Sequence, residues 1–204
     1  MFNLSNLLVS LVGIAMAISV HEFGHAYSAH LLGDDTAKYS GRMTLNPAKH
    51  VDPIGLLTLL IFRFGWAKPV PINSNNFKNY KVGNVIVSLA GAFGNLLCAI
   101  ACGLIAKYTI MYGSNFMFAE AIYTIFSSAI WYNIWFGAFN LLPVPPLDGW
   151  GVISALLPYK YNNFIYKYEN VGYMVLLIAL FTGAYSIILT PITRVFQMVV
   201  SRFR

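Results

Sequence analysis

The stretch MFNLSNLLVSLVGIAMAISVHEFGHAYSAH, from Met1 to His30, opens with twenty uncharged residues and continues into a pair of histidines. About 20 apolar residues suffice for a helix to cross the hydrocarbon core of a bilayer. No basic residue precedes the run, which favours a retained transmembrane helix over a cleaved signal peptide. Because the first lysine, Lys38, follows the run, the N-terminus is predicted outside and Lys38 inside.

The composition agrees with a membrane protein. The 204 residues are 58% hydrophobic and only 10% charged, whereas a soluble domain carries about a quarter charged residues. We therefore expect one membrane domain over residues 1–204, with the lipid bilayer as a partner. The net charge of +6 is interpreted as basic loops facing an anionic leaflet, and no nucleic-acid partner is expected.

Further charge-free runs predict an all-α polytopic membrane protein with about four transmembrane helices, besides a re-entrant or membrane-associated strand region. The third run contains three prolines close to its end. If the last run spans once, the arginines after it lie outside, so a fold-back at Pro191 is an alternative. The expected segments are a first helix within 1–33, a second over 82–107, a third over 117–149, and a C-terminal helix and tail over 170–204.

The connection over residues 34–81 is predicted to be cytoplasmic. Basic residues on one connection mark the inner side of a membrane protein. Within it, Pro53 to Phe62 is about half the length of a span, which favours a re-entrant or interfacial placement. The basic residues of the connection are Lys38, Arg42, Lys49, Arg63, Lys68, Lys78 and Lys81.

The sequence HEFGH, residues 21–25, predicts a metal site. On a helix, positions i and i+4 share a face, so His21 and His25 can bind one ion, with Glu22 beside it as a general base. In a soluble helix such residues are commonly just solvated. At the end of an apolar run that interpretation weakens, because ionisable groups inside a membrane are costly and usually functional.

Zinc in a catalytic site usually takes three protein ligands and a water, so a third ligand is needed. Asp148 follows LLPVPPL and precedes Gly149. The prolines break a helix there, and the predicted topology brings this break to the inner end of the membrane, level with His21 and His25. The competing candidate is His30, which lies five residues after His25 and thus about 140° around the helix.

Two asparagines lie in the apolar runs. Asn95 occurs in SLAGAFGNL and Asn140 in FNLLP. The simpler interpretation of each is a hydrogen bond between helices, which contributes about 1 kcal/mol. The functional alternative is that the amides hold a substrate peptide or stabilise a developing oxyanion.

The motifs HEFGH, LNPAKHVDPIG, GWAKPVPIN, SLAGAFGN and NLLPVPPLDG occur in this order. Together they resemble the site-2 protease family of intramembrane zinc metalloproteases, in its small form without a PDZ or CBS domain. The resemblance extends from about Ile18 to Gly149. Ala92 stands where the family often has proline, and Trp150 where a second glycine is usual. Residues 39–76 resemble the family's membrane-associated strand and re-entrant region.

The resemblance implies one zinc ion per chain, bound by His21, His25 and Asp148, with Glu22 as the general base. It also implies roles for Asn95 and Asn140 near the scissile bond.

The expected function is a zinc metalloendopeptidase that hydrolyses transmembrane proteins or peptides near the cytoplasmic face. The expected location is a bacterial or archaeal plasma membrane, with several passes. A transporter or channel that moves protons or metal ions through the same ionisable residues is the alternative. An inactive scaffold is a further alternative, against which the intact set of ligands and Glu22 argue.

Overall fold

The computed structural model describes residues 4–62, 65–113 and 116–203, and all regular elements within these ranges are helical. The predicted strand region is not confirmed, since within the described part of the chain Val51 and Ala67 form only an isolated antiparallel bridge. The α-helices are α1 (Leu4–Leu31), α2 (Thr36–Tyr39), α3 (Pro53–Phe62), α4 (Tyr80–Tyr112), α5 (Ala119–Asn140), α6 (Asp148–Leu156), α7 (Asn162–Thr182) and α8 (Tyr185–Ser201).

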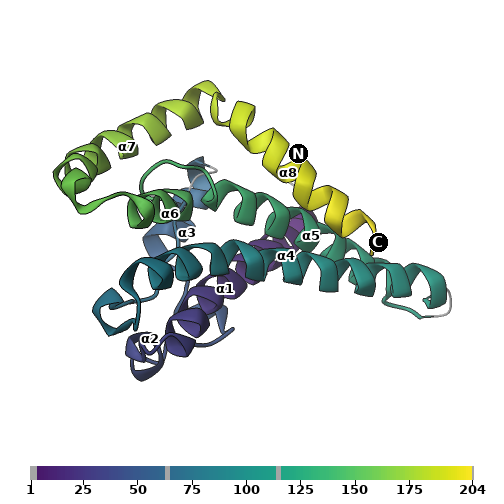
Figure 1. Ribbon diagram of the computed structural model, residues 1–204. Helices are drawn as coiled ribbons and strands as arrows, with labels where there is room; N and C mark the ends of the chain where they lie inside the picture. The colour runs from purple at the N-terminus through teal and green to yellow at the C-terminus, as the bar shows by residue number, and fades with distance from the viewer. Residues whose placement is uncertain (1–3, 63–64, 114–115, 204) are drawn as a thin grey trace.

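Three long helices, α1, α4 and α5, form the centre of the molecule. Helix α4 packs against both α1 and α5, α1 also contacts α5, and α8 lies against α5 (Figure 1). Small residues allow this close approach: a Cβ atom added to Gly24 of α1 would lie 2.6 Å from the Ala90 carbonyl oxygen of α4. The main cluster of buried side chains is Ala99, Cys102, Ala106, Ala129, Ile130, Ile134 and Val200.

Two helices in the described ranges are long and apolar enough to cross a membrane, over Ser5–Leu31 and Tyr80–Tyr112. The bent pair α7–α8 would count as a third span. The protein is therefore a membrane protein, but the predicted number of four spans is not confirmed. Helix α5 has 22 residues but is not among these candidate spans.

The C-terminal segment differs from the expectation. Helices α7 and α8 meet at 83°, and the chain turns at Gly183, whose φ of 75° is a left-handed conformation that favours glycine. Pro191, the predicted fold-back point, lies inside α8. The fold-back at Pro191 is thus wrong, because the glycine eight residues earlier supplies the turn.

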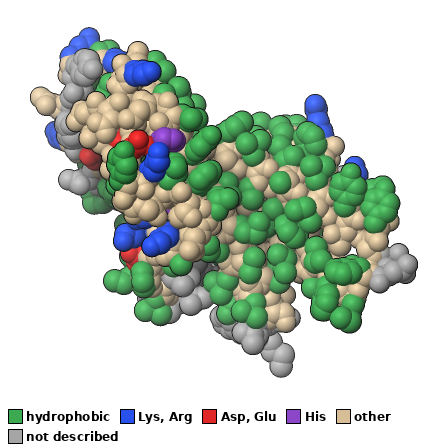
Figure 2. All heavy atoms as spheres, turned by 90° about the horizontal axis from the view of Figure 1, so that it is seen from below, with side chains coloured by type: hydrophobic (Ala, Val, Ile, Leu, Met, Phe, Trp, Pro, Cys, Tyr) green, Lys and Arg blue, Asp and Glu red, His purple; other side chains and the backbone are tan. Residues whose placement is uncertain are grey.

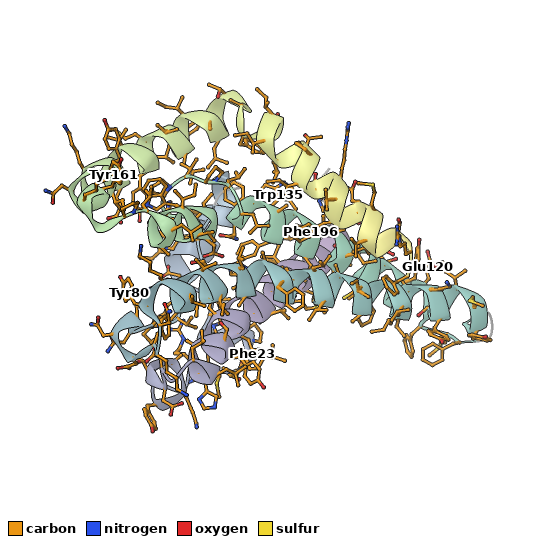
Figure 3. The ribbon with its side chains drawn as sticks, viewed as in Figure 1. Phe23, Tyr80, Glu120, Trp135, Tyr161 and Phe196 are labelled. Atoms are coloured by element: carbon orange, nitrogen blue, oxygen red, sulfur yellow. The ribbon has the colours of Figure 1, made fainter. Side chains whose placement is uncertain are left out.

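The surface separates apolar from charged regions. Figure 2 shows one face on which hydrophobic side chains cover the middle, while most of the charged side chains gather toward one end. Exposed fractions of 90% for Phe181 and 77% for Ile187 are costly in water and natural in lipid. Figure 3 shows Glu120 at the end of the molecule opposite to Tyr80 and Tyr161, so α5 begins far from the end where α4 begins.

Candidate metal centre

The two histidines of HEFGH lie in the C-terminal half of α1 and face the interior. His21 and His25 are 3% and 7% exposed, and their rings meet edge to face with centroids 4.6 Å apart. Helical spacing alone puts them on one face of α1. Their Nε2 atoms are 3.0 Å apart, so both rings present the same nitrogen to one point.

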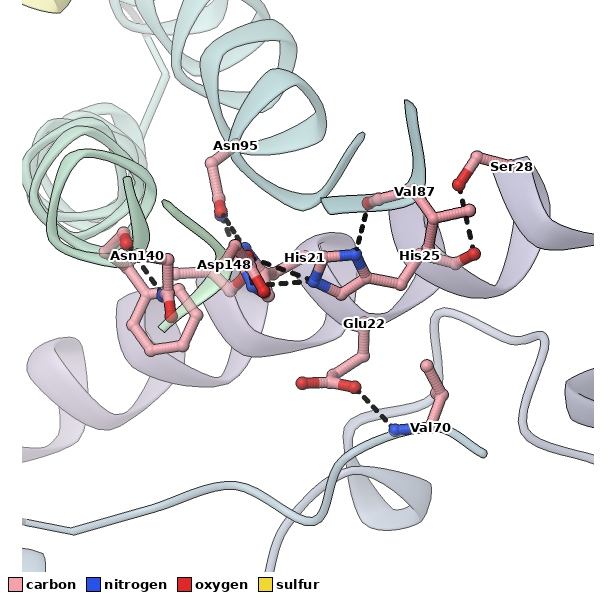
Figure 4. Close-up of polar contacts among 11 residues, drawn as sticks. His21, Glu22, His25, Ser28, Val70, Val87, Asn95, Asn140 and Asp148 are labelled. Carbon is pink, nitrogen blue, oxygen red and sulfur yellow. Dashed lines mark hydrogen bonds and ion pairs between the residues drawn. The ribbon is translucent and has the colours of Figure 1, made fainter. Parts of the chain in front are cut away.

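Asp148 is the first residue of α6 and reaches the same point. Its Oδ2 atom lies 3.0 Å from His21 Nε2 and 3.2 Å from His25 Nε2 (Figure 4). Only glycine fits after it, because a Cβ atom on Gly149 would lie 2.3 Å from the Leu141 carbonyl oxygen. Trp150 continues the helix despite departing from the family pattern. The structure thus brings His21, His25 and Asp148 together as a group that could hold a metal.

Hydrogen bonds on the far side of each ring determine where its proton lies. His21 Nδ1 is 2.8 Å from Asn95 Oδ1, and His25 Nδ1 is 2.7 Å from the Val87 carbonyl oxygen. Both oxygens are acceptors, so each ring donates from Nδ1 and its Nε2 lone pair is free. Two lone pairs and a carboxylate then face one another.

This arrangement fits zinc. Within the described part of the chain the buried Asp148 Oδ2 atom accepts no hydrogen bond, so a cation at the point of convergence would satisfy it and both nitrogens. Two histidine nitrogens and a carboxylate oxygen are a common catalytic zinc set. Bonds of about 2.0–2.1 Å in a tetrahedral site place ligand atoms roughly 3.3 Å apart, and the three atoms need only small movements to reach that spacing.

A glycine makes room for the two rings on the α4 side. A Cβ atom added to Gly91 would lie 2.6 Å from both His25 Nε2 and His21 Cε1. Any side chain here would occupy the space of the metal-facing atoms. The close approach of α4 therefore forms one wall of the site.

Glu22 is 7% exposed and points away from the three converging atoms, toward the connection between α3 and α4 (Figure 4). Its Oε2 atom accepts a 2.8 Å hydrogen bond from the Val70 N–H. The connection is fixed beside Val70 by Arg42, whose Nη2 donates to the Lys68 and Pro69 carbonyl oxygens at 2.6 and 3.2 Å. Sequence analysis did not identify Val70 or this second role of Arg42.

Asp34 anchors the far end of the same connection to the end of α1. The fully buried carboxylate accepts hydrogen bonds from the Thr36 hydroxyl, the Asn73 N–H and the Asn76 amide. Burial raises the pKa of Asp34, but these hydrogen bonds outweigh it and hold the pKa below its usual range. The ionised carboxylate therefore ties the connection to α1.

The remaining candidates lie elsewhere. His30 pairs with Asp35 at the end of α1, outside the group formed by His21, His25 and Asp148. The amide of Asn140 is partly buried and donates to the Phe136 carbonyl oxygen of its own helix at 2.9 Å.

Asn95 is fully buried behind His21. Besides accepting from the ring, its amide donates to the Ala17 carbonyl oxygen at 2.8 Å and to Asn133 Oδ1 at 2.9 Å. These contacts occupy both N–H groups of the amide. Asn133, which sequence analysis missed, lies seven residues before Asn140, and that spacing inside an apolar helix was the available signal.

Comparison with known proteins identifies relatives. The family model described as peptidase family M50 matches residues 103–183, which include Asp148. The chain is 38% identical to "Putative zinc metalloprotease YwhC" of Bacillus subtilis, over 88% of this chain and 83% of that protein. It is 29% identical to "Putative zinc metalloprotease Rip2" of Mycolicibacterium smegmatis, over 85% of this chain and 67% of that protein.

A protein of Mycobacterium tuberculosis with the same name is also 29% identical, over 72% of this chain and 56% of its own length. No solved structure matches the chain.

Proposed function

The chain belongs to peptidase family M50, the site-2 protease family of zinc metalloproteases, and we propose that it is an endopeptidase that cleaves transmembrane proteins or peptides. In this proposal His21, His25 and Asp148 bind one zinc ion per chain, and Glu22 is the general base.

The observation that carries the proposal is the convergence of His21 Nε2, His25 Nε2 and Asp148 Oδ2 within 3.0–3.2 Å of one another. Three buried acceptors at this spacing repel one another unless a proton or a metal cation lies between them. The convergence joins α1 to α6, segments far apart in the sequence, so helical periodicity alone does not account for it. Zinc is the cofactor that the family implies and that this donor set fits.

The chain's own residues supply the proton chemistry. Bound zinc provides Lewis-acid chemistry that polarises a carbonyl group and lowers the pKa of water toward about 7. Glu22 takes the proton from the water that attacks the scissile carbonyl carbon and delivers it to the leaving amide nitrogen as the C–N bond breaks. The Val70 N–H donates to Glu22 Oε2 at 2.8 Å and so fixes the orientation of the carboxylate.

The substrate is proposed to be a membrane-spanning segment that unwinds locally. A helical amide is shielded by its own hydrogen bonds, so helix-breaking residues in the substrate favour cleavage. Asn140 follows the same face of α5 as Asn133, two turns closer to α6. By turning from the Phe136 carbonyl oxygen, its amide could bind the substrate backbone or a developing oxyanion, in the role that the family resemblance implies.

The proposed location is the cell membrane, with a single multi-pass domain over residues 1–204 and cleavage near the cytoplasmic face. The basic connection that joins α1 to α4 defines that face. His21 and His25 lie within two to three turns of the Leu31 end of α1, which leads into this connection. The bond that is cut would therefore lie toward the inner side of the bilayer.

The test compares the wild type with Glu22→Gln and His21→Ala, purified in full length. Zinc content is measured by elemental analysis, and cleavage of a transmembrane reporter is measured for all three proteins, with the wild type and Glu22→Gln compared at matched zinc content. Glu22→Gln should keep about one zinc and lose turnover by roughly 10²–10⁴-fold, the usual contribution of a general base. His21→Ala should lose both zinc and turnover.

Two results would refute the proposal. Wild-type turnover by Glu22→Gln would exclude Glu22 as the base, and full zinc occupancy in His21→Ala would exclude the proposed ligand set. Uptake of protons or metal ions in liposomes, without any cleavage, would favour the transporter alternative.

A further inference from the structure

Behind His21, on the side away from Asp148, buried amides form a continuous chain of hydrogen bonds. The ring donates from Nδ1 to Asn95 Oδ1, and Asn95 Nδ2 donates to Asn133 Oδ1 at 2.9 Å. Asn133 Nδ2 then donates to the Ala129 carbonyl oxygen of its own helix at 2.9 Å. Asn95 and Asn133 are both 0% exposed, so water does not compete for these groups.

Every link in this chain has a fixed direction. A carbonyl oxygen can only accept, so the Ala129 oxygen makes Asn133 present its Nδ2 there and its Oδ1 to Asn95. Asn95 must in turn present its Nδ2 to Asn133, which leaves its Oδ1 for the ring of His21. The carbonyl of Ala17, which accepts from the same Nδ2 group at 2.8 Å, favours the same orientation.

The orientation matters because an amide can present either end to the ring. If Asn95 turned over, its N–H would face His21 Nδ1, and that nitrogen would have to accept. The ring proton would then lie on Nε2, the nitrogen 3.0 Å from Asp148 Oδ2. A protonated Nε2 has no lone pair for a metal, so the reversed amide excludes metal binding through this atom.

We propose that Asn133 is a positioning residue, which acts through Asn95 to keep the proton of His21 on Nδ1 and so leaves Nε2 free to bind zinc. The inference rests on the proposed function, in which His21 is a zinc ligand. It assigns Asn95 to the support of that ligand, because its amide has no N–H group left for a substrate. Helix α5 thus acts on the metal site without contacting the metal.

Packing offers a competing explanation. Phe136, one turn after Asn133, meets the His21 ring edge to face with centroids 4.9 Å apart, so any change in α5 could disturb the ring by displacing Phe136. Packing would hold the ring plane but would not select the protonated nitrogen. A double-mutant cycle separates the two, because a residue that acts only through Asn95 has no further effect once the Asn95 amide is gone.

The experiment measures the dissociation constant for zinc alone, by chelator competition, on full-length protein in detergent. The variants are Asn95→Leu, Asn133→Leu and the double variant. Ser127→Ala is the control on the same helix, because the buried Ser127 hydroxyl has no hydrogen-bond partner among the residues that the structure describes. Asn95→Leu should weaken zinc binding about 10–100-fold, as loss of a partner of a metal ligand does. Asn133→Leu should weaken it about three- to tenfold, less than a direct partner.

The double variant should bind zinc as Asn95→Leu does, and Ser127→Ala as the wild type does. Asn133→Asp should also retain the wild-type affinity, because a protonated carboxyl can donate to Ala129 and accept from Asn95 in the same directions. If Asn133→Leu does not fold, Asn133→Ala replaces it in the cycle.

If the double variant weakens zinc binding by the product of the two single-variant fold changes, the proposal is overturned in favour of packing. Wild-type zinc affinity in Asn133→Leu would overturn it as well. If His21→Ala binds zinc like the wild type, the proposed ligand set fails instead. The two failures are therefore distinguishable.

Discussion

Replacing Gly91 by alanine tests the geometry of the metal site most directly. The added Cβ atom would lie 2.6 Å from His25 Nε2 and from His21 Cε1, well inside the normal contact distance of about 3.5–4.0 Å. Without zinc, both imidazoles are free to turn away and relieve the overlap. With zinc, both Nε2 atoms must stay at the metal, so the penalty falls on the bound state.

Overpacking of this kind costs about 1–3 kcal/mol, which corresponds to a zinc affinity about 5- to 160-fold weaker. The fold itself should not suffer equally, because alanine favours a helix over glycine by about 0.5–1 kcal/mol. We therefore expect Gly91→Ala to bind zinc more weakly, with little change in the thermal unfolding of the metal-free protein.

The assay is chelator competition for zinc, with Gly94→Ala as the control. One turn further along α4, a Cβ atom on Gly94 would lie 3.2 Å from the Val20 carbonyl oxygen, a contact that a small shift relieves. Gly94→Ala should stay near the wild type. Wild-type zinc affinity in Gly91→Ala would refute the orientation of both imidazoles toward α4.

The Asp34→Asn variant should be less stable at neutral pH, because its amide N–H would face the Asn73 N–H and leave a buried donor unpaired. The pKa of Asp34 is lower in the folded state, so the carboxylate stabilises the fold above the unfolded pKa of about 3.9, and this contribution is lost as the pH falls through the folded pKa. Thermal unfolding should therefore show the wild type and Asp34→Asn to be equally stable at acidic pH but not at neutral pH. The topology is tested with single cysteines in a background without the native ones. A cysteine at the exposed Asn75 position should react with a membrane-impermeant maleimide only after the cells are permeabilised, whereas a cysteine at the exposed Met117 position should react in intact cells. The reverse pattern would refute the predicted topology.

The local features of this protein could be read from the sequence. An uncharged run followed by HEFGH predicts a helix of membrane length with His21 and His25 on one face, because the α-helical period is a property of the backbone. Prolines before Asp148 predict the break that ends one helix and begins another. The family resemblance is confirmed by the relatives. It rests on short motifs, from HEFGH to NLLPVPPLDG, which occur in a fixed order along the sequence and can therefore be recognised without a structure.

Properties that depend on how helices pack were decided by the tertiary structure alone. The rotation of α5 about its own axis directs Asn133 toward Asn95, and the crossing of α1 and α4 at small residues directs Asn95 toward His21, 74 residues away in the sequence. The Val70 N–H meets Glu22 only because Arg42 and Asp34 fix the connection over α1.

The period of a helix follows from the chain itself, whereas its rotation and neighbours follow from the burial of many side chains at once. The sequence therefore identifies the candidate ligands, and the packing identifies the residues that hold those ligands in place.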